Sequence, residues 1–98
     1  MSSPIISGFL FDDENEDEFA KHGVSPVQVE QLLENDGVVL PNRRTDLHRA
    51  THLFIGRDNG GAPITVPIEP THEPELWRPV TAWIAQTWDL AVLTKRGL

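Results

Sequence analysis

Apolar residues occur along the chain in short runs that either alternate with polar residues or recur at helical spacing. Residues 5–11 are mostly apolar and predict a first strand. Residues 13–22 predict a helix, because Asp12 or Asp13 can cap it and acids crowd its first turns. Gly23 follows, and glycine takes the left-handed conformation that ends many helices at the lowest cost. The chain is therefore expected to begin with a strand and an acidic helix.

A second helix is predicted immediately downstream. Ser25 is a favourable N-cap, and Pro26 suits the first helical position. The apolar residues at helical spacing are Val29, Leu32 and Leu33. Residues 35–37 have turn chemistry, residues 38–40 predict a short strand, and the polar residues 42–50 predict a loop.

A hairpin is the strongest signal in the second half of the chain. Residues 52–57 alternate, and residues 58–61 read Asp-Asn-Gly-Gly, which is typical of a tight turn between strands. Residues 64–68 alternate again and predict the return strand. Pro63 and Pro67 cannot donate to a ladder, so we expect this strand to lie at an edge of the sheet or to be bulged.

The last part of the chain predicts one more strand and a closing helix. The strand covers residues 77–83 and the helix residues 85–95. Within the helix, Trp88 and Val92, with Ala91 as a further option, are expected to face the core.

These elements give the order β-α-α-β-β-β-β-α within a single domain, residues 1–98. Helices on one face of an antiparallel sheet of four to five strands make a two-layer α+β fold. We expect the other face of the sheet to stay open, and to be the place where a site can form.

Composition narrows the classes of function. The 98 residues include no cysteine, which excludes disulfides, thiol catalysis and thiolate metal sites and fits a reducing cytoplasm. No apolar run approaches the ~18 residues that a membrane span needs, and no signal peptide is visible at the N-terminus. We therefore expect a cytoplasmic protein that makes no contact with a membrane.

The net charge of −7 is distributed unevenly. Residues 1–36 hold nine acids and one base, whereas residues 37–98 hold six acids and seven bases. An acidic half repels phosphate and can attract a basic partner, although such acids can also be the solvated face of a helix. A nucleic-acid surface would have to use the arginines of the second half, which include Arg43, Arg44, Arg49, Arg57 and Arg78.

The first third of the chain also carries a recognisable signature. Residues 11–15 read Phe-Asp-Asp-Glu-Asn, residues 20–26 read Ala-Lys-His-Gly-Val-Ser-Pro, and apolar residues follow at helical spacing. This looks like the N-terminal signature of BrnT-like proteins, the toxins of bacterial toxin–antitoxin pairs, which have a RelE/ParE-like fold related to that of RelE-type ribonucleases. Phe11 stands where the family usually has tryptophan. Residues 54–57 and 80–82 resemble the central hairpin and the last strand of the family.

The resemblance implies a toxin that blocks translation as a metal-independent endoribonuclease without a cofactor. Its partners would be a cognate antitoxin that covers the site and RNA or the ribosome, with a homodimer as a further option. Lys21, His22, Arg57 and Arg78 would bind the phosphate and transfer protons, with His52 as an additional proton-transfer residue.

Each of these residues also has a structural interpretation. Lys21 and His22 suit the C-terminal turn of a helix, whose last carbonyls they can satisfy. Arg57 and Arg78 suit ion pairs at strand ends. His48 and His52 have a spacing that binds zinc on a helix, but this stretch does not read as a helix and no third ligand is evident.

Two departures from the family leave a second function open. Trp83 stands where an arginine is frequent, and the closing helix has no base before Lys95. A ribonuclease of this kind needs fixed cations around the phosphate. The alternative is a catalytically degenerate member of the same fold that binds a protein, with Trp83 as an anchor.

Overall fold

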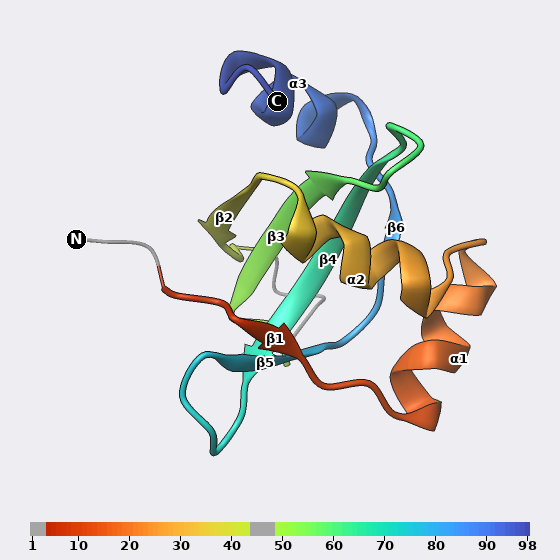
Figure 1. Cartoon of the computed structure of the whole chain (residues 1–98), viewed down its shortest axis with the longest axis vertical. Helices are drawn as coiled ribbons and strands as arrows, with labels where there is room; N and C mark the ends of the chain where they lie inside the picture. The colour runs from red at the N-terminus through yellow and green to blue at the C-terminus, as the bar shows by residue number, and fades with distance from the viewer. Residues whose placement is uncertain (1–3, 44–48) are drawn as a thin grey trace.

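In the computed structural model, two helices pack on one face of a twisted sheet and a third packs on the other (Figure 1). The structure describes residues 4–43 and 49–98. The helices are α1 (Asp13–Lys21), α2 (Pro26–Glu34) and α3 (Thr87–Lys95). The strands are β1 (Gly8–Phe9), β2 (Gly37–Pro41), β3 (His52–Arg57), β4 (Pro63–Pro70), β5 (Leu76–Pro79) and β6 (Trp83–Ile84). In the described part of the chain, no helix is long and apolar enough to cross a membrane.

The sheet has the order β1-β5-β4-β3-β2, and β6 pairs with β4 beyond the end of β5. All pairs are antiparallel except β1 with β5. The α+β class and the antiparallel sheet are therefore confirmed. The predicted last strand is divided into β5 and β6, and the first strand is shorter than predicted.

A bulge beside β4 explains why the prolines are tolerated there. The strand lies inside the sheet, so an edge position is wrong, and the extra residue of the bulge lies in the neighbouring segment and not in β4 itself. Val66 and Pro67 lie opposite the three residues 80–82, between the registers of β5 and β6. The carbonyl of Pro67 accepts from the backbone N–H of Val80 at 2.8 Å. Because the nitrogen and carbonyl of a strand residue point to the same side, the missing N–H of Pro67 faces the bulge.

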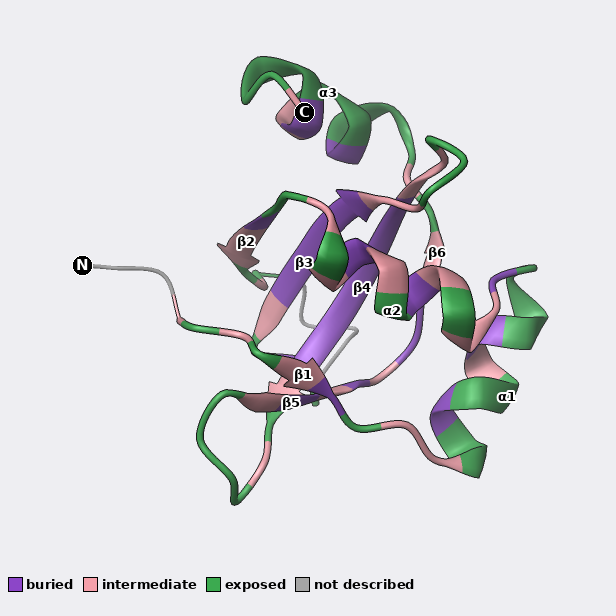
Figure 2. Cartoon of the chain, viewed as in Figure 1, coloured by how far each residue is buried: buried purple, intermediate pink, exposed green. Residues whose placement is uncertain are grey.

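Alternation along β3 divides the core between the two faces of the sheet. Phe54 faces α1 and α2 and packs in a cluster with Phe19 and Leu32. Ile55 faces the opposite way and packs with Leu93 of α3. Burial on both sides accounts for the buried residues along most of β3 and β4 (Figure 2). Placing all three helices over one face is therefore wrong, because α3 covers part of the face expected to be open.

The closing helix presents a different side to the core from the predicted one. Trp88 and Ala91 are exposed, and only Val92 is half buried. Instead, Leu93 and Asp89 are buried. The helix begins at Thr87, two residues later than predicted. The Asp89 carboxylate turns inward and accepts a hydrogen bond from the hydroxyl of Thr65 in β4.

The helix caps agree with the sequence. Asp12 caps α1, and Asp12 and Asn15 exchange side-chain-to-backbone hydrogen bonds as a capping box. Ser25 and Gln28 do the same for α2. Gly23 has a φ of 72°, in the left-handed region that was predicted for it.

Candidate functional site

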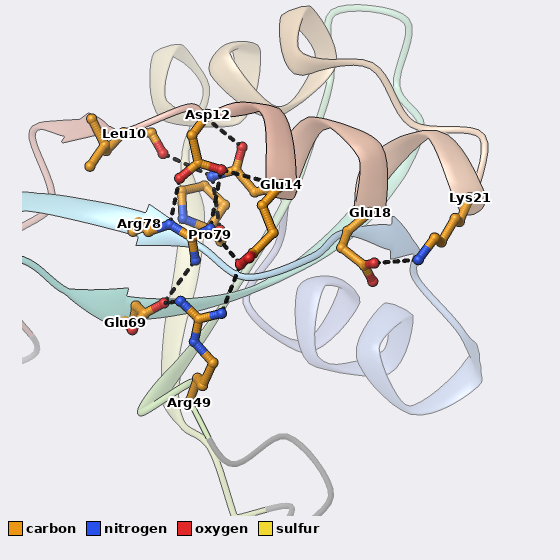
Figure 3. Close-up of polar contacts among 10 residues, drawn as sticks. Leu10, Asp12, Glu14, Glu18, Lys21, Arg49, Glu69, Arg78 and Pro79 are labelled. Atoms are coloured by element: carbon orange, nitrogen blue, oxygen red, sulfur yellow. Dashed lines mark hydrogen bonds and ion pairs between the residues drawn. The ribbon is translucent and has the colours of Figure 1, made fainter.

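Lys21 and His22, the two residues predicted for catalysis at the end of α1, each contact another side chain. Lys21 Nζ donates to Glu18 Oε2 at 2.6 Å. The His22 imidazole meets the indole of Trp83 edge to face, with ring centroids 6.3 Å apart. Lys21 lies at the far end of α1 from Arg78 (Figure 3), and a helix of nine residues spans about 13 Å.

Arg57 and His52 lie at opposite ends of β3. Arg57 Nη1 donates to the carbonyl of Gly61 at 3.0 Å, within the hairpin that follows the strand. His52 begins the strand and meets the ring of Trp77 edge to face at 5.2 Å. The structure does not bring Arg57 together with His52, Lys21 or Arg78.

Arg78 is the centre of an ion-pair network at the N-terminus of α1 (Figure 3). Its Nε donates to Asp12 Oδ2 at 2.7 Å, and Nη1 donates to Glu69 Oε2 at 2.9 Å. Its Nη2 donates to Glu14 Oε1 at 3.0 Å. Arg49 bridges Glu14 and Glu69 at 2.8 and 3.0 Å. The guanidinium of Arg78 is engaged by three carboxylates, which raise its pKa above the ordinary value, and its charge is neutralised locally.

The same network is expected to make the fold sensitive to acid. Hydrogen bonds from Arg78 and from the Asn15 backbone lower the pKa of Asp12, and hydrogen bonds from Arg49 and Arg78 lower the pKa of Glu14. A folded-state pKa below the unfolded value means that this stability is present at neutral pH and is lost as pH falls below about 5. Urea unfolding between pH 7 and 3 measures the loss. A free energy of unfolding that stays constant over this range would contradict the expectation.

A pocket of about 1030 Å³ lies on the sheet face that α3 leaves partly uncovered. Leu40 and Leu53 line it from β2 and β3, on the same side of the sheet as Ile55. The remaining walls include Trp83 of β6, Trp88 and Asp89 of α3, and His22 from the end of α1. Large, mainly apolar pockets with a few polar groups are the usual form of a binding site.

Two buried polar side chains accompany the apolar walls of this pocket. The Asp89 carboxylate accepts from the hydroxyl of Thr65 at 2.7 Å and from the Trp83 indole N–H at 3.4 Å. Thr81 is only 7% exposed, and its hydroxyl oxygen has no hydrogen-bond partner among residues 4–43 and 49–98. Buried polar groups normally have such partners, so an orphaned hydroxyl beside a pocket is unusual.

The two threonines are expected to respond in opposite ways to replacement by valine. Thr65→Val removes the hydroxyl that serves the buried carboxylate, and should cost about 2 kcal/mol. Thr81→Val removes an unpaired hydroxyl at nearly constant volume, and should leave stability unchanged or raise it by about 1 kcal/mol. Urea unfolding of both variants makes the comparison. Equal losses from the two would show that the hydroxyl of Thr81 has a partner.

Sequence reasoning singled out only part of this pocket. His22 and Trp83 were among its candidates, whereas Asp89 and Thr81 were not. The one sequence signal that could have indicated Asp89 is its position as the single acid in a mainly apolar helix.

The zinc interpretation pairs His52 with His48, which lies outside the described residues, as Arg44 does. Within residues 4–43 and 49–98, no group of three or more His, Asp or Glu side chains could hold a metal ion.

Comparisons with family models, with curated proteins and with solved structures found no match to this chain, so the likeness to BrnT-like toxins rests on the residues quoted above.

Proposed function

We propose that this chain is a protein-binding module, a catalytically degenerate relative of BrnT-like toxins that holds its partner at the pocket. The observation that carries the proposal is the engagement of Arg78 by three carboxylates. A phosphate-binding centre needs cations that are fixed and also available to the substrate. Lys21 and Arg57 are engaged elsewhere, at separate places in the fold.

The surface beside the pocket supports a protein partner. Trp88 is 60% exposed and also lines the pocket, so its ring is open to a partner that lies there. Exposed tryptophans beside a pocket are typical of the residues that contribute most to the free energy of protein–protein binding. A net charge of −7 further favours a partner of opposite charge.

Trp88→Ser is expected to weaken the complex with a partner by about tenfold or more, because a central aromatic anchor is lost. The product of the neighbouring reading frame is the partner to co-express and purify with the chain, as the toxin–antitoxin resemblance suggests. Val27→Ser is the matched control, since Val27 is 64% exposed on α2 and does not line the pocket. Both variants should keep their free energy of unfolding within about 0.5 kcal/mol. Failure to form a complex, or equal binding by both variants, would overturn the proposal.

The ribonuclease is the second candidate, and the position of His22 favours it. The imidazole lines the pocket, and a histidine can take the proton of a ribose hydroxyl. Our proposal predicts that the pure protein leaves RNA intact and that its expression does not arrest bacterial growth. Cleavage that is lost in His22→Ala and kept in His72→Ala, a change in an exposed loop residue, would establish the ribonuclease instead.

A further inference from the structure

Asp89 is a buried acid with no basic partner in the described part of the chain. It is 8% exposed, and its donors are a threonine hydroxyl, an indole N–H and, at 3.5 Å, the backbone N–H of Gln86. All of these donors are neutral. The N-terminus of α3 offsets part of the charge, because Asp89 lies in the first helical turn. Buried carboxylates are nevertheless usually paired with a cation, and this one lines the pocket.

The walls around Asp89 fit a long basic side chain. Leu40 and Leu53 offer apolar surface for the methylene groups of an arginine or lysine. Trp83 and Trp88 add indole rings, which attract guanidinium and ammonium groups. Glu18 contributes a second carboxylate to the lining, although Lys21 shares it.

Two positive or titratable groups oppose such a ligand. Arg43 and His22 also line the pocket. Both are exposed, so water and salt screen their charges. Asp89 is buried, where a charge acts through a lower effective dielectric and interacts more strongly. The buried carboxylate therefore has the greater influence on which ligand charge is favoured.

We propose that the pocket receives an arginine or lysine side chain of the partner, whose cationic group pairs with the Asp89 carboxylate. This inference rests on the proposed function, and it specifies the chemistry of the partner segment. A single basic residue would be the minimal element that the pocket recognises.

The test is an NMR titration of the full chain, observed at the indole N–H signals of its tryptophans. The probe is acetyl-Gly-Arg-Gly-amide, compared with the same peptide carrying Glu or Phe at the centre. The arginine peptide should shift the signals of Trp83 and Trp88. Trp77 is the internal reference, since its indole N–H donates to the carbonyl of Ile5 away from the pocket.

Charge variants then test the carboxylates. Asp89→Asn should weaken binding of the arginine peptide by about tenfold, as expected for a charge-assisted contact. Glu18→Gln should weaken it by about two- to fivefold, as expected for an exposed pair. Glu16→Gln is the matched control on α1, because Glu16 is exposed and does not line the pocket. If Asp89→Asn does not fold, the affinities of Glu18→Gln and Glu16→Gln for the arginine peptide still test the inference. Equal affinities of these two variants would overturn it.

Other outcomes would also overturn it. Tighter binding of the phenylalanine peptide would make the pocket an apolar anchor site. Shifts caused by guanosine monophosphate, with none caused by the arginine peptide, would make it a nucleotide site. If the complex with the partner forms and depends on Trp88 while the arginine peptide has no effect, this inference fails and the proposed function stands.

Discussion

Replacing Asn15 with alanine is expected to destabilise the fold by about 3–4 kcal/mol. The side chain is fully buried. Its Nδ2 donates to the carbonyls of Leu10 and Pro79 at 2.9 and 3.0 Å, and its Oδ1 accepts from the backbone N–H of Asp12 at 3.0 Å. Alanine would leave all three backbone groups without this partner, and each unsatisfied buried group costs about 1–3 kcal/mol. Urea unfolding at neutral pH measures the difference.

Gln28→Ala is the matched control for this prediction. Gln28 has the same capping-box position in α2, and its Oε1 accepts from the backbone N–H of Ser25 at 2.9 Å. Its Nε2 also donates to Asp58 Oδ2 at 2.9 Å, so its loss should cost about 1–2 kcal/mol for a cap and one part-buried hydrogen bond. The excess cost of Asn15→Ala measures how much more the buried link between α1 and the end of β5 contributes than the link from α2 to Asp58. Equal costs for the two variants would mean that the buried link contributes no more than the link to Asp58.

Local features of the fold were predictable because their causes lie within a few residues. Ser25 and Asp12 cap their helices through groups three residues away, and Gly23 ends α1 by its own backbone conformation. The glycine-containing turn joins β3 to β4 as the sequence predicts. Asn15, by contrast, was noted only through a family signature. Its contact with Pro79 joins residues 64 positions apart, which no local pattern reveals.

The errors concern features that depend on distant parts of the chain. Proline within a strand suggested an edge, because the bulge that accommodates Pro67 belongs to the neighbouring segment 80–82. The inward side of α3 could not be read from its sequence, since Trp88 and Leu90 make its outer side as apolar as its inner side. Asp89 and Leu93 are buried because they contact Thr65 of β4 and Ile55 of β3, and the sequence of α3 does not contain this information.

The candidate site shows the same limit. Arg78 looked like an available cation on a strand. The β4–β5 register places it opposite Glu69, and the path of β1 beside β5 brings the N-cap Asp12 to it. Whether a base is free or paired therefore depends on strand pairing. The pocket likewise combines α1, β2, β3, β6 and α3, which no spacing rule connects.

Arg78→Met is expected to cost about 3 kcal/mol, because it leaves three carboxylates close together without their central cation. The Arg78 side chain is only 12% exposed, so water can replace little of what it provides. Methionine keeps much of the apolar stem, so the loss reports mainly on charge. Urea unfolding at pH 7 should show the full cost. The cost should shrink near pH 3, where protonated carboxyls no longer repel one another.

Arg49→Met is the control that compares an exposed ion pair of the network with the contacts of Arg78. The Arg49 side chain is 53% exposed, and exposed pairs contribute about 0–1 kcal/mol. Its loss should therefore be small while Arg78 remains, because Arg78 still bridges Asp12, Glu14 and Glu69. If Arg78→Met costs no more than Arg49→Met, the guanidinium of Arg78 is held only loosely by these carboxylates. A loosely held guanidinium could turn to a phosphate, and the ribonuclease would then become the better explanation of this fold.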